Sequence, residues 1–454
     1  MKKILLIGSG AREHVIAEAL KRSCGSRAGI FINGNEVELG VYGGAVNPGL
    51  KALASEYRVG NVMDFEALCA FAREFKPDFA FIGPDDPIGA GAVNALLEVG
   101  VRSVAPLKSL ARLESSKSFT RDLVEKYKIP GNPRYKVFVS ELGSLDFPEE
   151  GLREWMNELG EYVVKADGLL GGKGVQVSGE HLKSVEEGIA FTKASIEKFG
   201  RVVVEEKLVG VEFSLMSFCD GTHVVDMPAV QDHKRAFEGD TGPNTGGMGT
   251  YSDADGSLPF LTTADVASAH DITVAMAAAL KTECGAEFKG IMYGGFMATR
   301  DGVKLIEYNA RFGDPEVMNV LPLLKTDFVE VCEAIIDGTL DQVLVEFERR
   351  AVVVKYVCPE GYPTAPVKGE KIVVGAVPAG VHVYYGSVDA GEDGLYLLGS
   401  RAVAMVGVAD TLAEAEKLAE AGAMAVAGPV FHRHDIGTTE LVAKKVEMMR
   451  GLRR

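Results

Sequence analysis

The chain has 454 residues, of which 47% are hydrophobic, and a formal net charge of −16 at pH 7. This length predicts about three domains, and so negative a charge argues against broad binding to nucleic acid or to anionic membranes. Six scattered cysteines without a C-x-x-C spacing, no apolar run of about 18 residues and no signal peptide predict a cytoplasmic protein with reduced thiols.

The chain begins with the pattern of a βαβ unit. Lys2–Ile7 predicts a buried parallel strand, and Gly8-Ser-Gly-Ala-Arg-Glu-His14 turns it into a helix that runs through Leu20. The free N–H groups of a helix N-terminus suit an anion. Because position 13 is Glu, the dinucleotide pattern G-x-G-x-x-G is absent, and the phosphate of a smaller metabolite fits as well.

A second strand of this type is predicted at residues 78–82. It ends in Gly-Pro84-Asp85-Asp-Pro, and a helix is predicted from about Gly89 to Val99. Ligands of open α/β sheets bind beyond the carboxyl ends of the strands, so Asp85 is placed to take a sugar hydroxyl. The alternative is that Asp85 caps the helix that follows.

Helices are predicted over residues 106–128, which carry Ser-Ser-Lys117, and a small α/β unit over residues 135–205. Within that unit, Lys165-Ala-Asp-Gly-Leu-Leu-Gly-Gly-Lys173-Gly174 joins two short apolar runs. This pattern predicts a β-hairpin whose glycine-rich, cationic tip binds phosphates. The tip lacks the P-loop pattern and leads into a strand instead of a helix. The alternative is a hairpin turn that binds nothing.

Two polar, glycine-rich segments follow the strand predicted at residues 201–204. They are Asp232-His-Lys-Arg235 and Thr241–Gly249. Long loops inside a compact domain are usually disordered or functional, and the neighbouring cations favour a substrate loop. Amphipathic helices are predicted at residues 263–285 and 327–337.

The run of residues 303–306 predicts a strand that leads into Glu307-Tyr-Asn309-Ala-Arg311-Phe-Gly-Asp314-Pro-Glu316. Side chains alternate along a strand, so Glu307 and Asn309 point to one side. Two hard oxygen donors on one face suit Mg²⁺, which completes its octahedron with phosphates and water. The alternative is a surface glutamate beside a turn asparagine. From about residue 346 a strand-dense region is predicted, ending in a helix opened by the capping box Thr411-Leu-Ala-Glu414.

The chain resembles the ATP-grasp superfamily and, within it, the glycinamide ribonucleotide synthetase (phosphoribosylamine–glycine ligase) family over nearly its whole length. The motifs that carry the resemblance are Ile7–His14, Gly83-Pro84, Gln231–Arg235, Gly242–Gly249 and Asn309–Glu316. The family usually has a second glycine where Ala11 stands. The resemblance implies an α/β and α+β multidomain protein. Its parts are a parallel, Rossmann-like pre-ATP-grasp domain that binds phosphoribosylamine (1–105), a helical linker (106–134), an ATP-grasp lid (135–205), an ATP-grasp core (206–345) and a strand-rich C-terminal domain (346–454).

The resemblance also implies a reaction. ATP, glycine and 5-phosphoribosylamine give glycinamide ribonucleotide, ADP and phosphate through glycyl phosphate, with Mg²⁺ or Mn²⁺, in purine biosynthesis. It implies a monomer or weak homodimer with no nucleic-acid or membrane partner. The alternatives are another ATP-grasp carboxylate–amine or carboxylase-type ligase, which would lack the 231–249 segments, and a non-catalytic nucleotide sensor, which would lose a metal ligand.

The site residues implied by the resemblance fall into four groups. The metal ligands are Glu307 and Asn309. The ATP-binding residues are Lys117, Lys165, Gly171, Gly172, Lys173 and Gly174, with Glu205, Glu206 and Leu208 beside adenine and Glu212 at the ribose. The substrate-binding residues are Gly8, Ser9, Gly10, Arg12, Glu13, Pro84, Asp85, Asn244, Thr245, Gly246, Gly247, Met248 and Asp314. The catalytic residues are Arg311, Lys173, Asp232 and Arg235.

Two of these assignments, and two histidines outside the four groups, have alternatives. Arg311 suits either the transferring phosphoryl group or the glycine carboxylate. Lys173 is either a phosphate ligand or a solvated loop charge. Beside the catalytic group, His233 is either a general base or a histidine held by structural hydrogen bonds, and His14 is expected to position the first turn rather than to titrate.

Overall fold

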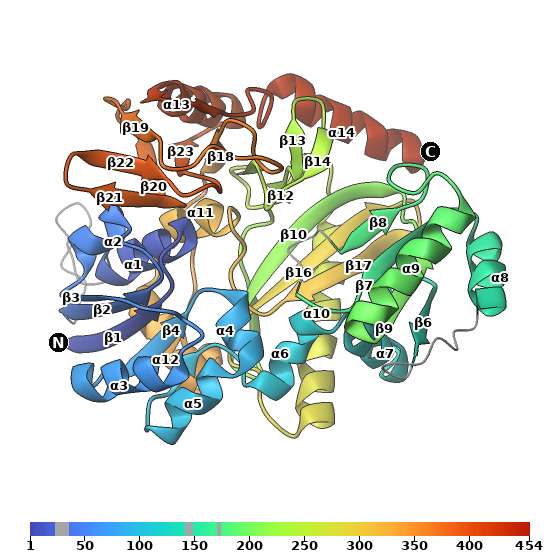
Figure 1. Ribbon diagram of the computed structural model, residues 1–454, viewed down its shortest axis with the longest axis horizontal. Coiled ribbons are helices and arrows are strands. Elements are labelled where there is room, and N and C mark those ends of the chain that lie inside the picture. Colours follow the sequence, from blue (N-terminus) through green and yellow to red (C-terminus); the bar gives the residue numbers. More distant parts are fainter. Residues whose placement is uncertain (23–35, 141–148, 170–173) are drawn as a thin grey trace.

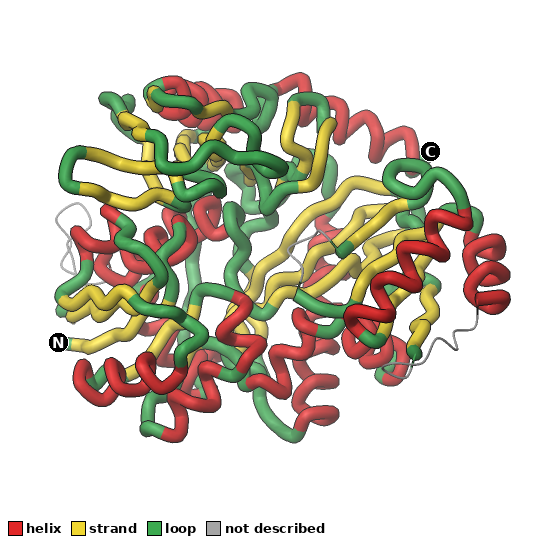
Figure 2. Tube along the Cα trace, in the orientation of Figure 1, coloured by secondary structure: helices red, strands yellow, loops and turns green. Residues whose placement is uncertain are grey.

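The structure is a computed structural model that describes residues 1–22, 36–140, 149–169 and 174–454. The N-terminal region, the central region and the C-terminal region meet near the middle of the molecule (Figure 1). The N-terminal parallel sheet lies beside the C-terminal strand-rich region, and the long curved strands of the central sheet lead to a smaller sheet at the other end of the molecule (Figure 2). The predicted multidomain α/β architecture is confirmed.

The N-terminal sheet is parallel and has the strand order β3-β2-β1-β4-β5. Because the order reverses between β1 and β4, the turns after these two strands face the crevice where such sheets bind ligands. The strands are β1 (Lys2–Ile7), β2 (Val37–Gly43), β3 (Glu56–Val59), β4 (Phe79–Ile82) and β5 (Ser103–Val104). The helices are α1 (Ala11–Arg22), α2 (Pro48–Leu53), α3 (Phe65–Phe75), α4 (Asp85–Ala90) and α5 (Ala92–Glu98).

The helix predicted to begin near Gly89 begins earlier and is broken in two. Gly91, with φ 110°, ends α4 and precedes α5, because glycine adopts this left-handed conformation without a steric penalty. Pro84 occupies the cap position of α4 and Asp85 is its first residue. Asp85 therefore lies at the carboxyl end of β4, as the sequence predicts.

The predicted helices of residues 106–128 are α6 (Lys108–Ser115) and α7 (Lys117–Lys126). The following unit is an antiparallel sheet with the order β6-β9-β7-β8, covered by α8 and α9, and the predicted hairpin is confirmed by the pairing of Lys165 with Val175. Its elements are β6 (Tyr135–Val139), α8 (Glu149–Leu159), β7 (Tyr162–Ala166), β8 (Val175–Val177), α9 (Val185–Phe199) and β9 (Arg201–Glu206).

The central sheet has the order β11-β10-β16-β17 and packs against α10. Strand β17 continues past the predicted run and includes both Glu307 and Asn309. The elements are β10 (Gly210–Cys219), β11 (Val224–Asp226), α10 (Thr263–Cys284), β16 (Gly290–Thr299), β17 (Gly302–Asn309), α11 (Val317–Val320) and α12 (Phe328–Asp337). The predicted amphipathic helices correspond to α10 and α12.

The polar segments predicted as loops contain short strands instead. They are β12 (Gln231–Asp232), β13 (Arg235–Phe237), β14 (Thr241–Asn244) and β15 (Gly249–Ser252). Thr250 and Tyr251 of β15 are buried and pair with β18. Strands of two to four residues are too short to show an alternation of polar and apolar residues. The polar, glycine-rich composition of these segments therefore predicted loops.

The C-terminal sheet has the order β12-β15-β18-β23-β20, so the 231–252 segment belongs to it through β12 and β15. The remaining elements are β18 (Ala351–Pro359), β19 (Lys371–Val374), β20 (Val381–Tyr385), β21 (Val388–Gly391), β22 (Gly394–Leu397), β23 (Val403–Ala409), α13 (Leu412–Met424), β24 (Val426–Ala427), β25 (Val430–Phe431) and α14 (Thr439–Leu452). Thr411 caps α13 as predicted. The prediction that this helix is the last element is wrong, because α14 follows it under a second threonine cap, Thr438. Among the described residues, no helix is both long and apolar enough to cross a membrane.

His14 joins the N-terminal unit to the C-terminal sheet. Its Nδ1 accepts the backbone N–H of Tyr385 at 3.1 Å, and its ring stacks on the Tyr385 ring. Burial lowers the pKa of His14 to about 4 from an ordinary 6.5. Between these two pKa values, the unfolded chain binds more protons at His14 than the folded chain does. The stability that neutral His14 contributes is therefore fully present above the unfolded pKa, and it is lost as the pH falls toward the folded pKa.

We expect His14→Gln to flatten the pH dependence of the unfolding free energy, because a glutamine oxygen accepts the same N–H without titrating. The native chain should lose about 3 kcal/mol more than the variant between neutral pH and about pH 4. Urea unfolding across this range measures the difference. Parallel curves for the two proteins would show that His14 does not carry this proton linkage.

Candidate active site

A cavity of about 350 Å³ lies where the parts of the molecule meet. Among the described residues it is lined by seven cationic and six anionic side chains, so it suits a polyanion together with a cation. The cations are Arg12, Lys117, Arg121, Lys165, Lys234, Arg311 and Arg401, and the anions are Asp85, Glu114, Asp232, Glu307, Asp314 and Glu316.

The cavity brings together many of the residues that the sequence predicts. Those that line it are Arg12, Asp85, Lys117, Lys165, Gly174, Asp232, Thr245, Gly246, Glu307, Asn309, Arg311 and Asp314. Those outside its lining are Gly8, Ser9, Gly10, Glu13, Pro84, Glu205, Glu206, Leu208, Glu212, Arg235, Asn244, Gly247 and Met248. Gly171, Gly172 and Lys173 lie outside the described residues.

Lys165 is held by a buried ion-pair network behind the cavity. Its Nζ lies 2.5 Å from Glu205 Oε1 and donates to the carbonyl of Ile306 at 3.1 Å. Arg121 donates hydrogen bonds from two nitrogens to the two oxygens of the same carboxylate, at 2.8 and 3.1 Å. Burial lowers the pKa of Lys165, while the charge of Glu205 opposes that shift. The side chain of Glu205 thus positions a cavity lysine.

Lys117 is fixed where α7 meets the base of the glycine-rich hairpin. Asp167 accepts the Lys117 backbone N–H and the Ser118 hydroxyl, each at 2.5 Å. The Lys117 ammonium donates to the carbonyl of Gly168 at 2.9 Å. Asp167 therefore couples the first residues of the hairpin loop to a helix N-terminus, a role that the sequence analysis missed.

Glu307 stands among cations on β17. Burial opposes its charged form, but the surrounding positive charge outweighs burial and holds the pKa of Glu307 below its ordinary value. The cations are Lys234, Lys165, Lys117 and Arg311. Beside it, the Asn309 oxygen accepts from Arg311 at 3.2 Å, and Arg311 also pairs with Glu114 at 2.9 Å. An ionised carboxylate and an amide oxygen in one cavity are donors that fit a hard divalent metal.

Two further carboxylates, Asp232 and Glu316, line the same cavity. Burial, together with the nearby charge of Glu316, raises the pKa of Asp232 well above its ordinary value. Glu316 itself accepts the hydroxyl of Tyr293 at 2.5 Å. Two repelling carboxylates in a buried wall are stabilised by a bound cation, so this wall suits a ligand that carries a positive charge.

The C-terminal region contributes Arg401, which no sequence pattern singled out. Its guanidinium pairs with Asp314 at 3.1 Å and donates to the carbonyls of Gly246 and Gly247 at 2.8 and 3.1 Å. Asp314 also accepts the hydroxyl of Tyr356 at 2.6 Å. Arg401 thereby fixes the 245–247 turn against the cavity. An isolated arginine in a strand-rich segment carries no local signal of this role.

In the first turn, the buried carboxylate of Glu13 accepts the Gly10 N–H at 2.6 Å and pairs with Arg12 at 2.8 Å. A Cβ on Gly8, where φ is 116°, would lie 2.6 Å from the Glu13 carboxyl carbon. The turn therefore needs glycine there to enclose Glu13. Asp85 faces the cavity nearby, and although burial opposes its charge, Arg311 and Arg12 hold its pKa below the ordinary value.

Several predicted residues have structural contacts outside the cavity lining. Arg235 donates to the carbonyl of Gly242 at 2.9 Å and pairs with Glu180 at 2.5 Å, and Glu206 accepts the backbone N–H of Arg134 at 2.9 Å. Met248 is fully buried.

A small second cavity of about 20 Å³ is lined by Glu212, and also by Asp232, Lys234 and Glu307 of the main cavity. His233 is buried outside both cavities, with Nδ1 3.3 Å from the carbonyl oxygen of Gly249, and burial lowers its pKa to about 4. Its Nε2 is buried without a hydrogen-bond partner among the described residues, but its burial away from both cavities favours the structural alternative for His233.

Comparison with known proteins adds independent evidence. Three domain families match the chain, described as the N domain (residues 2–114), the ATP-grasp (A) domain (115–317) and the C domain (352–439) of phosphoribosylglycinamide synthetase. A phosphoribosylamine–glycine ligase of Methanocaldococcus jannaschii is 48% identical over 100% of both chains. One from Thermococcus kodakarensis is 45% identical over 99% of both.

Solved structures agree with this assignment. A phosphoribosylamine–glycine ligase of Thermotoga maritima superposes with a TM-score of 0.76 at 28% identity, covering 95% of this chain and 99% of that one. The biotin carboxylase domain of a Hydrogenobacter thermophilus 2-oxoglutarate carboxylase shares the fold, with a TM-score of 0.69 at 13% identity, covering 99% of this chain and 94% of that one. The chain is thus an ATP-grasp ligase that belongs to the phosphoribosylglycinamide synthetase family.

Proposed function

We propose that this protein ligates glycine to 5-phosphoribosylamine at the expense of ATP, forming glycinamide ribonucleotide, ADP and phosphate for purine biosynthesis. Relatives that match it over their full length carry the corresponding name. The observation that carries the proposal is the shared cavity, where the N-terminal Arg12 and Asp85 meet Lys165 of the hairpin and Glu307 of β17. A phosphorylated sugar and a nucleotide can therefore react in one place.

In the first step, a glycine carboxylate oxygen attacks the γ-phosphorus of ATP, the bond to the bridging oxygen breaks, and ADP leaves. This step makes glycyl phosphate, which is needed because a free carboxylate would have to expel oxide. Phosphoryl transfer depends on positioning and on neutralising charge. Lys117 and Lys165 would contact the phosphates. Glu307 and Asn309 would hold Mg²⁺ or Mn²⁺, which neutralises phosphate charge when bound.

Glycine carries an ammonium group as well as the reacting carboxylate. The Asp232 and Glu316 carboxylates repel one another in their buried wall, so they would accept the ammonium. Arg311 would contact the carboxylate or the transferring phosphoryl group, since it lies beside Asn309. Arg401 would keep the 245–247 turn and Asp314 in place around this substrate.

In the second step, the amine of phosphoribosylamine attacks the carbonyl carbon of glycyl phosphate. The carbon–oxygen bond to phosphate breaks, phosphate leaves, and the nitrogen gives up a proton to phosphate or water. Arg12 and the Gly8–Gly10 turn would hold the sugar phosphate, and Asp85 a sugar hydroxyl.

Mass-spectrometric detection of the product tests this function. Purified protein with ATP, Mg²⁺, glycine and phosphoribosylamine should form glycinamide ribonucleotide, and omission of either co-substrate should abolish it. No glycinamide ribonucleotide, together with ADP formation that requires bicarbonate in place of glycine, would support the carboxylase-type alternative. We further propose a cytoplasmic monomer or weak homodimer, with domain limits near residues 105, 134, 205 and 345.

We expect Ser9→Asp to raise the Michaelis constant for phosphoribosylamine by about tenfold or more while barely changing that for ATP. The substitution places a negative charge in the turn at the N-terminus of α1, where an anion is otherwise favoured. The triphosphate is accounted for by Lys117 and Lys165 of the cavity lining, which does not include Ser9. Steady-state kinetics with each substrate varied in turn measure the effect. A larger change for ATP would contradict this assignment of the first turn.

A further inference from the structure

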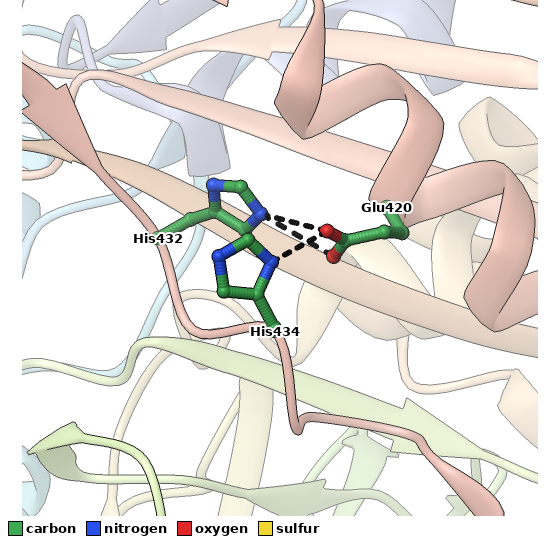
Figure 3. Close-up of side chains that lie close together, drawn as sticks. All are labelled: Glu420, His432 and His434. Carbon is green, nitrogen blue, oxygen red and sulfur yellow. Dashed lines mark hydrogen bonds and ion pairs between the residues drawn. The ribbon is translucent and has the colours of Figure 1, made fainter.

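The C-terminal region contains a cluster of possible metal ligands outside the cavity. Glu420 of α13 faces His432 and His434, as Figure 3 shows. His432 Nε2 lies 3.2 and 3.3 Å from the two carboxylate oxygens, and His434 Nδ1 lies 2.6 Å from Oε1. The ligand atoms of all three residues lie within 4.8 Å of one another. None of these residues has a role in the proposed reaction.

The local chain path explains why the two histidines meet. They follow β25, and side chains two residues apart on an extended segment point to the same side. Arg433 between them is buried and bonded to Asp435 at 2.8 Å and to Asp240 at 3.0 Å. This anchor fixes the segment from behind and directs both imidazoles toward α13.

The charge balance leaves room for a cation. The buried ammonium of Lys355 lies 2.6 Å from Glu420 Oε2 and 2.7 Å from Glu416 Oε1, and it also donates to the carbonyl of His434 at 2.7 Å. One ammonium therefore faces two carboxylates, and this balance among the three groups favours a further cation. Lys355 engages Oε2 of Glu420, which leaves Oε1 directed to the histidines.

The three side chains differ in burial, and this difference would let a metal ion enter from solvent. The side chain of His432 is 8% exposed, that of Glu420 26% and that of His434 57%. A metal ion could enter from the exposed His434 side without opening the core.

We propose that Glu420, His432 and His434 bind a divalent transition metal of the zinc class, with a fourth position open to water. Two imidazole nitrogens and a carboxylate oxygen are ligands that Zn²⁺ accepts in tetrahedral sites. Metal–ligand distances of about 2.0–2.1 Å place tetrahedral ligands roughly 3.3 Å apart, close to the separations from His432. The exposed His434 has to move slightly away from Glu420 when metal binds, because its Nδ1 lies only 2.6 Å from Oε1 without metal.

A bound metal ion would link the segment after β25 to α13 and would thereby stabilise the C-terminal region. The competing explanation is that the three side chains form only hydrogen bonds and ion pairs. Both explanations predict the same contacts without metal, so they must be separated by metal affinity and by its dependence on each histidine.

The test uses the full-length protein, stripped with a chelator and free of ATP. Co²⁺ serves as a spectroscopic probe and Zn²⁺ competes for it. The variants are His434→Ala and His432→Ala. The matched control is His270→Ala, because His270 also pairs with a carboxylate, Asp226, at 2.8 Å but lies outside the cluster.

We expect the wild type and His270→Ala to bind one Co²⁺ with tetrahedral visible absorption that Zn²⁺ displaces. Each cluster variant should lose at least about 10- to 100-fold in Zn²⁺ affinity. Zn²⁺ should raise the melting temperature of the wild type and the control but not of His434→Ala, and Mg²⁺ should not replace it. Equal Zn²⁺ affinity in His434→Ala and the wild type, or no binding by the wild type, would overturn the proposal.

Discussion

Replacing Glu307 with glutamine is expected to reduce kcat/KM by at least about 100-fold while leaving the fold intact. The change keeps the shape of the side chain but removes its negative charge. Four cations hold that charge in place, and a divalent metal at the phosphates would need it as a ligand. Activity measured over a range of Mg²⁺ concentrations should show that the variant needs far more metal.

Glu287→Gln is the matched control, since Glu287 is a surface carboxylate that pairs with Lys281 at 2.8 Å and is not part of the cavity lining. It should match the wild type in activity and in melting temperature. Undiminished activity of Glu307→Gln at limiting Mg²⁺ would refute the metal assignment. A large loss of melting temperature would instead identify Glu307 as a structural residue.

Lys165→Met should raise the Michaelis constant for ATP and slow turnover, together reducing kcat/KM for ATP by about 100-fold or more. The ammonium of Lys165 is held rigidly at the cavity wall by Glu205 and by the carbonyl of Ile306. Arg121 still engages Glu205 in the variant, so no carboxylate is left buried and unpaired. Steady-state kinetics with ATP varied, together with thermal unfolding, measure both parts of the expectation.

Lys193→Met is the control for this substitution, because Lys193 of α9 pairs with Glu149 of α8 and lies outside the cavity lining. It removes a lysine charge from the neighbourhood of the same sheet without changing the cavity. Wild-type ATP affinity and rate in Lys165→Met would show that this lysine serves only the ion pair with Glu205.

The predictable parts of the fold are those with strong periodicity or strong end signals. The strand Lys2–Ile7 is a continuous apolar run, and the helix Thr263–Cys284 is long and has clear end signals, the capping box of Thr262 with Asp265 and Gly285 at its end. The short strands β12 to β15 were not predictable, since they depend on tertiary pairing. The break at Gly91 is local, but the sequence alone does not distinguish a left-handed glycine from a glycine inside a continuous helix. Strand β15 exists because β18, about a hundred residues later in the chain, pairs with it.

The site was predictable where chemistry and sequence spacing coincide. Glu307 and Asn309 lie two residues apart on one strand and therefore share a face, and Lys165 directly precedes a glycine-rich segment. Each of these residues could therefore be recognised from its neighbours in the sequence. Arg401 and Glu114 carry no such local signal, because they reach the cavity only through the packing of separate elements. Glu205 had a signal at the end of β9, but only the structure shows that its side chain pairs with Lys165 and Arg121.

The most direct test is to measure ADP release from ATP by the purified protein, with glycine and phosphoribosylamine added separately and together. Sustained release is expected only when both are present, with one glycinamide ribonucleotide formed for each ADP. Glycine alone should give at most a single turnover, because glycyl phosphate then has no amine to attack it. Sustained ADP release that ignores phosphoribosylamine, or that requires bicarbonate in place of glycine, would contradict the proposed ligation.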